Sequence, residues 1–265
     1  MTPRLARYDC RNNRLAQFAL EQDEFEQAVA RLRDAHGPVR VGVFIGTSTS
    51  GILETELGYR ARTAPDAPLP EGVSLEYHQN VFSAAAFVRA YLRLDGPAVA
   101  VSTACSSSAK VFAQAARYIE AGFCDAAVVG GVDTLCYTTL YGFHSLQLLS
   151  PDPCRPCAPH RTGISIGEAA GFAILERRAP AAGEILFEGY GESSDAHHMS
   201  SPDPDGSGAE AAMSEALARA GLGADAIDYV QMHGTGTPAN DGVEDMAIAR
   251  LFGAAPAVSS TKGWT

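Results

Sequence analysis

Residues 98–110 read AVAVSTACSSSAK, and the cysteine within this stretch decides how the chain is interpreted. Ala98–Val101 is a run of small and β-branched residues, which predicts a short buried strand. Ser107–Glu120 then carries apolar residues at helical spacing, so we expect Cys105 where a strand turns sharply into a helix. The free N–H groups at the helix start would favour the thiolate of a nucleophile. A cysteine in an apolar strand is equally a small core hydrophobe, and the pattern alone leaves both roles open.

Four further motifs follow along the chain. They are GGVD at Gly130–Asp133, RPCAPHRTGISIGEAAG at Arg155–Gly171, HGTGTPANDGVE at His233–Glu244 and STKGWT at Ser260–Thr265. With the cysteine stretch, and in this order, they resemble the β-ketoacyl-[acyl carrier protein] synthases, the elongating condensing enzymes of bacterial fatty-acid and polyketide synthesis. The resemblance covers essentially the whole chain. It implies an α/β, thiolase-like fold with α-β-α-β-α layers built from two related βαβαβ halves.

The resemblance also suggests a family member cut at both ends, without the opening strand and the C-terminal strands. Residues 179–184, APAAGE, give the best internal boundary, so we expect residues 1–178 to form the N-terminal half with the nucleophile. Residues 179–265 would begin an incomplete, strand-rich C-terminal half. Near the N-terminus, one apolar stripe from Leu15 to Leu32 predicts a helix. Further strands are predicted at Val39–Ile45, Asp125–Gly130, Phe172–Glu176 and Ile227–Met232.

Decarboxylative Claisen condensation needs a thiol that takes an acyl chain and donors that hold an enolate oxygen. Cys105 fits the first requirement, and His233, directly after a predicted strand, fits the second. The resemblance implies that Lys262 orders the site and that Thr235 and Thr237 contact the pantetheine arm of the carrier. The remaining candidates are supporting acids: Asp241, Glu244 and Glu168, the last of which we expect to be a hydrogen-bonded structural residue.

Two departures from the family pattern stand beside this site. The usual Arg-Pro-Phe-Asp is RPCA at 155–158, and the usual Arg-Asp-Gly is RTG at 161–163, which leaves the substrate's identity open. The family motif continues with Gly-His after Thr265, so the second catalytic histidine would fall just beyond these 265 residues. Cys154 and Cys157 form a CxxC without a second ligand pair at a suitable spacing, so we expect no metal.

Composition narrows the choice of partners and compartment. The net charge of −11 argues against nucleic acid, and no apolar run is long enough for a membrane span. Six scattered cysteines and the lack of a basic-apolar leader predict a cytoplasmic protein. The resemblance implies acyl carrier protein as a partner, with Arg11 and Arg14 as candidate docking residues, although two solvated arginines are the simpler interpretation. It also implies a dimer, either of two copies or with a related synthase subunit, and no cofactor.

Two other classes of function stay open. A catalytically incomplete partner subunit or fragment would dock on a complete synthase and shape its pocket, but such subunits usually lack the nucleophile that Cys105 provides. A thiolase-like acyltransferase would share the cysteine, but it would not be expected to carry HGTGTP. Formation of an acyl-enzyme at Cys105, together with CO₂ release from malonyl-carrier, would distinguish these classes.

Overall fold

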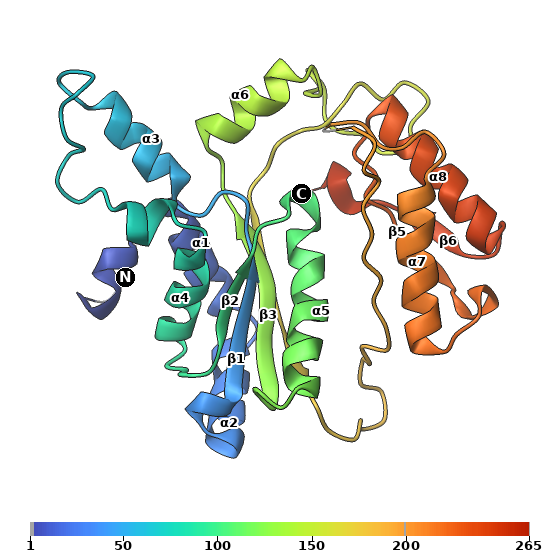
Figure 1. Ribbon diagram of the computed structural model, residues 1–265, viewed down its shortest axis with the longest axis horizontal. Coiled ribbons are helices and arrows are strands. Elements are labelled where there is room, and N and C mark those ends of the chain that lie inside the picture. Colours follow the sequence, from blue (N-terminus) through green and yellow to red (C-terminus); the bar gives the residue numbers. More distant parts are fainter. Residues whose placement is uncertain (1–2, 199, 265) are drawn as a thin grey trace. The chain divides into compact units, whose positions relative to one another are not determined.

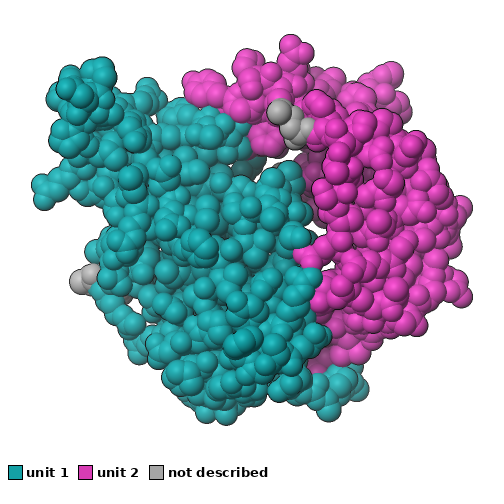
Figure 2. All heavy atoms as spheres, viewed as in Figure 1, with its two compact units in different colours: residues 1–139, 167–183 teal, residues 140–166, 184–265 magenta. Residues whose placement is uncertain are grey.

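The computed structural model describes residues 3–198 and 200–264 of the chain. Two units emerge from its internal contacts (Figure 2). Unit 1 consists of residues 1–139 and 167–183, and unit 2 of residues 140–166 and 184–265. The predicted division of the sequence at 178/179 stays a prediction about domains, because unit 2 also takes in the earlier segment 140–166.

Unit 1 is built on a four-stranded sheet in the order β2-β1-β3-β4 (Figure 1). The strands are β1 (Val41–Gly46), β2 (Ala98–Val101), β3 (Ala126–Asp133) and β4 (Ala169–Glu176). β1 pairs in parallel with both β2 and β3, whereas β4 is antiparallel to β3. Gly46 therefore lies opposite both Val101 and Gly131, so three parallel strands end at one edge of the sheet.

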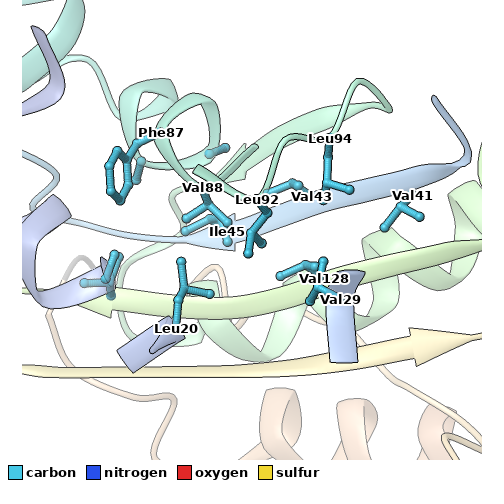
Figure 3. Packing of buried hydrophobic residues seen from close by; sticks show 14 of the residues in the cluster. Leu20, Val29, Val41, Val43, Ile45, Phe87, Val88, Leu92, Leu94 and Val128 are labelled. Atoms are coloured by element: carbon cyan, nitrogen blue, oxygen red, sulfur yellow. The ribbon is translucent and has the colours of Figure 1, made fainter. Parts of the chain in front are cut away.

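Helices cover both faces of this sheet because its central strands alternate their side chains between two cores. The helices of unit 1 are α1 (Arg11–Leu20), α2 (Phe25–His36), α3 (Ile52–Arg60), α4 (Phe82–Tyr91) and α5 (Ser107–Glu120). Val41, Val43 and Ile45 of β1 join residues of α1, α2 and α4 in one core, part of which is shown in Figure 3. Phe44 of the same strand faces Val111 of α5 in the other core. Among the described helices of unit 1, α5 is the one that packs on this face of the sheet (Figure 1).

The structure has two helices, α1 and α2, where the apolar stripe predicts one. The prediction of a single N-terminal helix is therefore wrong. Asp23 and Glu24 have left-handed φ values of 51° and 57°, which a continuing helix cannot contain. Phe18, which lies in α1 and within the predicted stripe, is 63% exposed. The buried side of α1 consists of Asn12, Asn13, Ala16 and Leu20.

The central strand and helix predictions are confirmed, with β2 and α5 at their predicted bounds. β4 begins at Ala169, three residues earlier than predicted, since its ladder with β3 extends to Asp133. β2 is only half-buried, because it forms the edge of the sheet and lacks a neighbour on one side. The single chain therefore leaves β2 half-buried, and burial of this strand against a second subunit stays a prediction.

Unit 2 contains α7 (Ser207–Ala220), α8 (Pro238–Phe252) and a parallel pair of three-residue strands, β5 (Tyr229–Gln231) and β6 (Ala257–Ser259). α6 (Tyr137–Ser145) crosses the division between the units. Within the described residues, the segment 185–191 forms no strand, and β5 and β6 are the strands that follow residue 184. Gly191 instead lies close against the Ala212 carbonyl of α7, and Glu192 N–H donates to Glu215 at 2.9 Å.

Candidate active site

Cys105 lies in a single turn of 3₁₀ helix, Ala104–Ser106, between β2 and α5. Its side chain is exposed, so of the two interpretations of the sequence the buried core cysteine is excluded. Ala104 has a left-handed φ of 54°, which makes the reversal between strand and helix sharp. Because α5 starts two residues later, the cysteine stands at the positive end of a 14-residue helix.

One buried hydroxyl closes the turn around this cysteine. Ser107 Oγ accepts a hydrogen bond from Thr103 N–H at 2.8 Å and donates to the Ala104 carbonyl at 2.6 Å. Ser107 is 3% exposed, so water does not compete for these bonds. Ser107 therefore links the residues on both sides of Cys105.

Two glycines set how closely α5 approaches the sheet. A Cβ atom on Gly46 would lie 2.5 Å from Ser108 N, and one on Gly131 would lie 2.7 Å from Ser108 Cβ. Neither glycine has a positive φ, so the requirement is for space and not for an unusual backbone conformation. The first turn of α5, and with it Cys105, is seated on two strands that have no side chains at these positions.

In unit 2, His233 follows β5 and the buried Met232 in a loop that leads to α8. Glu244 on α8 receives two backbone donors from this loop, His233 N–H at 2.6 Å and Gly234 N–H at 2.9 Å. The carboxylate thereby fixes the main chain on both sides of the histidine Cα. Glu244 therefore holds the loop that carries His233, and its role in supporting catalysis stays a prediction.

Lys262 donates from its ammonium group to His233 Nδ1 at 3.0 Å and also to the His233 carbonyl. An ammonium group is only a donor, so Nδ1 accepts and the proton of the neutral ring lies on Nε2. Burial lowers the pKa of His233, and the positive charge of Lys262 lowers it further. His233 is therefore a neutral hydrogen-bond donor through Nε2–H near pH 7.

The start of α8 is held by a buried ion pair. Asp241, 2% exposed, accepts from Gly236 N–H at 3.1 Å and from Cys157 N–H at 2.8 Å. Arg161 lies 3.4 Å from the same carboxylate and donates to the Thr237 carbonyl at 3.0 Å. A buried carboxylate needs such a cation, and it fastens the segment 155–161 to the loop that carries His233.

Thr235 and Thr237 lie together, with 2.9 Å between their hydroxyl oxygens. Thr237 also caps α8, since its Oγ1 accepts from Asn240 N–H at 3.4 Å. Both threonines are half-buried, which leaves part of each side chain at the surface of the loop. Contact with a pantetheine arm stays a prediction.

Glu168 has the structural position expected for it. Its carboxylate accepts two hydrogen bonds from the Arg11 guanidinium, both 2.6 Å long, and one from Leu135 N–H at 2.8 Å. The hydrogen bond from Arg11 is the main cause of the lowered pKa of Glu168. Arg14 pairs with Asp9 at 2.7 Å. Both candidate docking arginines are therefore engaged within the chain and are not simply solvated, and their contact with a carrier stays a prediction.

The sequence did not single out three residues that organise these loops: Ser107, Asp133 and Arg161. Asp133 and Arg161 lie within the quoted motifs, but the turn that Asp133 holds is 84 or more residues away, and the carbonyls of Thr237 and Pro238 that Arg161 holds are 76 or more residues away. Among the described residues, no group of three or more His, Cys, Asp or Glu side chains is arranged to hold a metal ion. In the same part of the chain, no helix is long and apolar enough to cross a membrane.

Comparison with known proteins identifies the family of both parts of the chain. The family model for the beta-ketoacyl synthase N-terminal domain matches residues 13–181, and the model for the C-terminal domain matches residues 185–265. Nodulation protein E of Rhizobium meliloti is 39% identical over 237 residues, which are 84% of this chain and 57% of that protein. The 3-oxoacyl-[acyl-carrier-protein] synthase 2 of Vibrio cholerae is 36% identical, over 85% of this chain and 58% of its own.

Solved structures agree with this result. The ketosynthase ApeO of Xenorhabdus doucetiae, determined in complex with its chain length factor ApeC, matches with a TM-score of 0.89 and 40% identity, over 100% of this chain and 65% of that one. A beta-ketoacyl synthase from Burkholderia phymatum matches with a TM-score of 0.82 and 27% identity, over 98% of this chain and 66% of that one. The chain thus spans less than two thirds of the length of these proteins. The predicted thiolase-like α/β fold is confirmed, and the chain belongs to the beta-ketoacyl synthase family.

Proposed function

We propose that the protein catalyses decarboxylative condensation of an acyl thioester with malonyl-[acyl carrier protein], which yields β-ketoacyl-[acyl carrier protein] for fatty-acid or polyketide elongation. The observation that carries this proposal is the exposed Cys105 at the N-terminus of α5, in a turn closed by Ser107. The names of the relatives agree with it, since they include a 3-oxoacyl-[acyl-carrier-protein] synthase and a ketosynthase.

In the first step, the Cys105 thiolate attacks the carbonyl carbon of the acyl thioester. A new C–S bond forms, the bond to the carrier sulfur breaks, and that sulfur leaves as a thiol after taking up a proton. The free N–H groups at the start of α5 lower the energy of the attacking thiolate. The exposed side chain gives the large acyl donor access to the sulfur.

In the second step, malonyl-carrier loses CO₂, and the electron pair of the broken C–C bond becomes an enolate. Its oxygen needs a donor that stays neutral before the reaction and strengthens as charge develops. His233 fits this role through Nε2–H, because Lys262 occupies Nδ1. The enolate carbon then attacks the acyl carbonyl on Cys105, which restores the thiolate as the new C–C bond forms.

We further propose that efficient decarboxylation requires the second histidine of the family motif, which would follow Thr265. The test compares CO₂ release from malonyl-carrier by this chain with release by a version continued through the Gly-His segment and the following strands. We expect at least about 100-fold faster release from the extended version, the usual effect of one oxyanion donor. Equal rates would refute the assignment of chemistry to the second histidine.

The partners and compartment belong to the same proposal. We infer that acyl carrier protein delivers both substrates and that the edge strand β2 pairs with a second synthase subunit, since its outer side lacks a strand neighbour in the described chain. The reaction needs no metal or cofactor. A cytoplasmic location is supported by six cysteines that are all unpaired.

The competing function is a non-catalytic partner subunit, and the ketosynthase ApeO was itself solved together with a second chain, its chain length factor ApeC. Cys105→Ala separates the two possibilities. If the protein is a condensing enzyme, the wild type incubated with labelled acyl-carrier protein gains one acyl group at Cys105, and Cys105→Ala gains none. If it is a partner subunit, the wild type gains none either. Unchanged labelling of Cys105→Ala would refute Cys105 as the nucleophile, and an unlabelled wild type would favour the partner subunit.

A further inference from the structure

One oxygen atom at the end of β3 accepts four hydrogen bonds. Asp133 Oδ1 accepts from the Thr47 hydroxyl at 2.9 Å, from Ser48 N–H at 2.8 Å, and from the Thr49 N–H and hydroxyl at 2.9 Å each. All four donors belong to the turn that follows β1. This one side-chain oxygen is therefore the common acceptor for the whole turn.

The environment makes these bonds strong. Thr47 and Thr49 are 0% and 5% exposed, so water does not compete for their hydroxyl groups, whereas Ser48 between them is exposed. The Thr49 hydroxyl also accepts from Thr134 N–H at 3.1 Å, and the Thr47 hydroxyl accepts from Ser50 N–H at 2.9 Å. The end of β3 and the turn after β1 are thus joined into one unit with Asp133 at its centre.

The same turn holds the strand that leads to the nucleophile. Thr47 N–H donates to the Val101 carbonyl at 3.1 Å, at the last residue of β2 and four residues before Cys105. Beyond the cysteine, Ser107 and Ser108 lie against the backbone of Gly46, the residue before Thr47. Residues 102–106 are therefore anchored on both sides by the segment that Asp133 fixes.

We propose that Asp133 is a positioning residue for Cys105, which acts through the turn 47–49. This inference rests on the proposed role of Cys105 as the acylated nucleophile. Loss of the carboxylate would leave the N–H groups of Ser48 and Thr49 without their acceptor, and the turn would rearrange to satisfy them. The anchor at Val101 would move with it, and attack by a thiol is sensitive to displacements of about 1 Å.

The structure offers a matched control at the opposite end of the same strand. Asp125, directly before β3, accepts two hydrogen bonds from Arg40 at 2.8 and 2.9 Å. Asp125→Ala therefore removes a hydrogen-bonded carboxylate from the same strand without touching the turn 47–49. Asp133→Asn is the conservative variant, because its amide oxygen can still accept from the turn.

The first measurement is self-acylation of the full chain by a radiolabelled octanoyl N-acetylcysteamine thioester, normalised to the folded fraction by circular dichroism. We expect Asp133→Ala to lower the rate constant at saturation roughly tenfold or more, with the half-saturating concentration changed less than about twofold. Asp133→Asn should recover most of the rate, and Asp125→Ala should match the wild type. Equal rates for Asp133→Ala and wild type, or equal losses in Asp133→Ala and Asp125→Ala, would overturn the inference.

The second measurement is hydrogen exchange over residues 46–50 and 101–107, which does not depend on any enzymatic activity. Asp133→Ala should speed exchange in both segments, and Asp125→Ala in neither. If Asp133→Ala does not fold, Thr49→Val is the alternative variant. It removes the Thr49 hydroxyl, one of the four donors, and keeps the shape of the side chain. The acylation rate and the exchange should then change in the same direction but by less. Unchanged exchange in residues 101–107 would refute the coupling between Asp133 and the Cys105 turn. A wild type that is never acylated would refute the proposed function instead, and the exchange result would then decide on Asp133.

Discussion

Replacing Gly46 with alanine tests whether the close approach of α5 to the sheet sets the position of Cys105. The added Cβ would lie 2.5 Å from Ser108 N and 2.6 Å from the Ser107 carbonyl carbon, both of which are backbone atoms. Side-chain rotation cannot relieve such a contact. To reach even 3.4 Å, the start of the helix must withdraw by about 0.9 Å.

That displacement sets the expected magnitudes. Overpacking at a rigid contact costs about 2 kcal/mol, which lowers Tm by roughly 4–8 °C in a chain of this size. Because Cys105 lies two residues before α5, a withdrawal of almost 1 Å also moves the sulfur, and displacements of that size cost about 100-fold in rate. We therefore expect Gly46→Ala to fold and to be acylated roughly 100 times more slowly than wild type.

Gly171→Ala is the control for this experiment. Gly171 lies opposite Gly131 in the β3–β4 ladder, and nothing is within 4 Å of the position of its missing Cβ. Alanine there should raise stability by about 0.5 kcal/mol, since it removes backbone freedom from the unfolded chain. Thermal melts and the acylation rate are measured for both variants. A Gly46→Ala protein that is as stable and as rapidly acylated as Gly171→Ala would show that α5 does not need its close approach.

Three further predictions concern charged and titrating groups. Arg161→Met should cost about 3 kcal/mol in urea denaturation because it leaves the Asp241 carboxylate buried without its cation, and a loss below about 1 kcal/mol would contradict this. His233 has a lowered pKa in the folded state, so its contribution to stability is present above its unfolded pKa of about 6.5 and is lost as the pH falls through the folded value. When Tm is measured from pH 8 to pH 5, it should therefore fall less in His233→Gln than in wild type. Glu168 also has a lowered pKa, so its contribution is present above the unfolded pKa of about 4.3 and is lost as the pH falls through the folded value. The difference in Tm between wild type and Glu168→Gln should therefore shrink on acidification, and a constant difference would contradict the role of the ionised carboxylate.

The parts of the fold that the sequence predicts well are those in which local pattern and burial agree. β2 and α5 occur at their predicted residues because a four-residue apolar run and a clear helical period stand on either side of Cys105. The break between α1 and α2 was missed because the apolar period continues across it. Asp23 and Glu24 adopt left-handed conformations there, although neither is a glycine that would have marked the turn.

The catalytic candidates and the residues that hold them differ in how they can be found. Cys105 and His233 stand out because their neighbours form motifs that are contiguous in the chain. Asp133 and Arg161 act through hydrogen bonds to backbone groups at least 76 residues away, and no local pattern encodes such a partner. Almost every residue also carries the same backbone N–H and C=O groups. The identity of the loop residues therefore does not indicate which distant carboxylate or guanidinium will form hydrogen bonds with their backbone.

The same distinction bears on the departures from the family pattern in segment 155–163. The family's aspartate after Arg-Pro-Phe is replaced by Ala158, and the backbone N–H of Cys157 donates to the carboxylate of Asp241 on α8. Arg161 supplies the compensating charge to that carboxylate and donates to the Thr237 carbonyl at the start of α8. A substitution in segment 155–161 is therefore tolerated when it leaves these backbone contacts in place. Substitutions at Arg161 or Asp241 are not, because each would leave a buried charge or N–H group without its partner, in the loop that sets the position of His233.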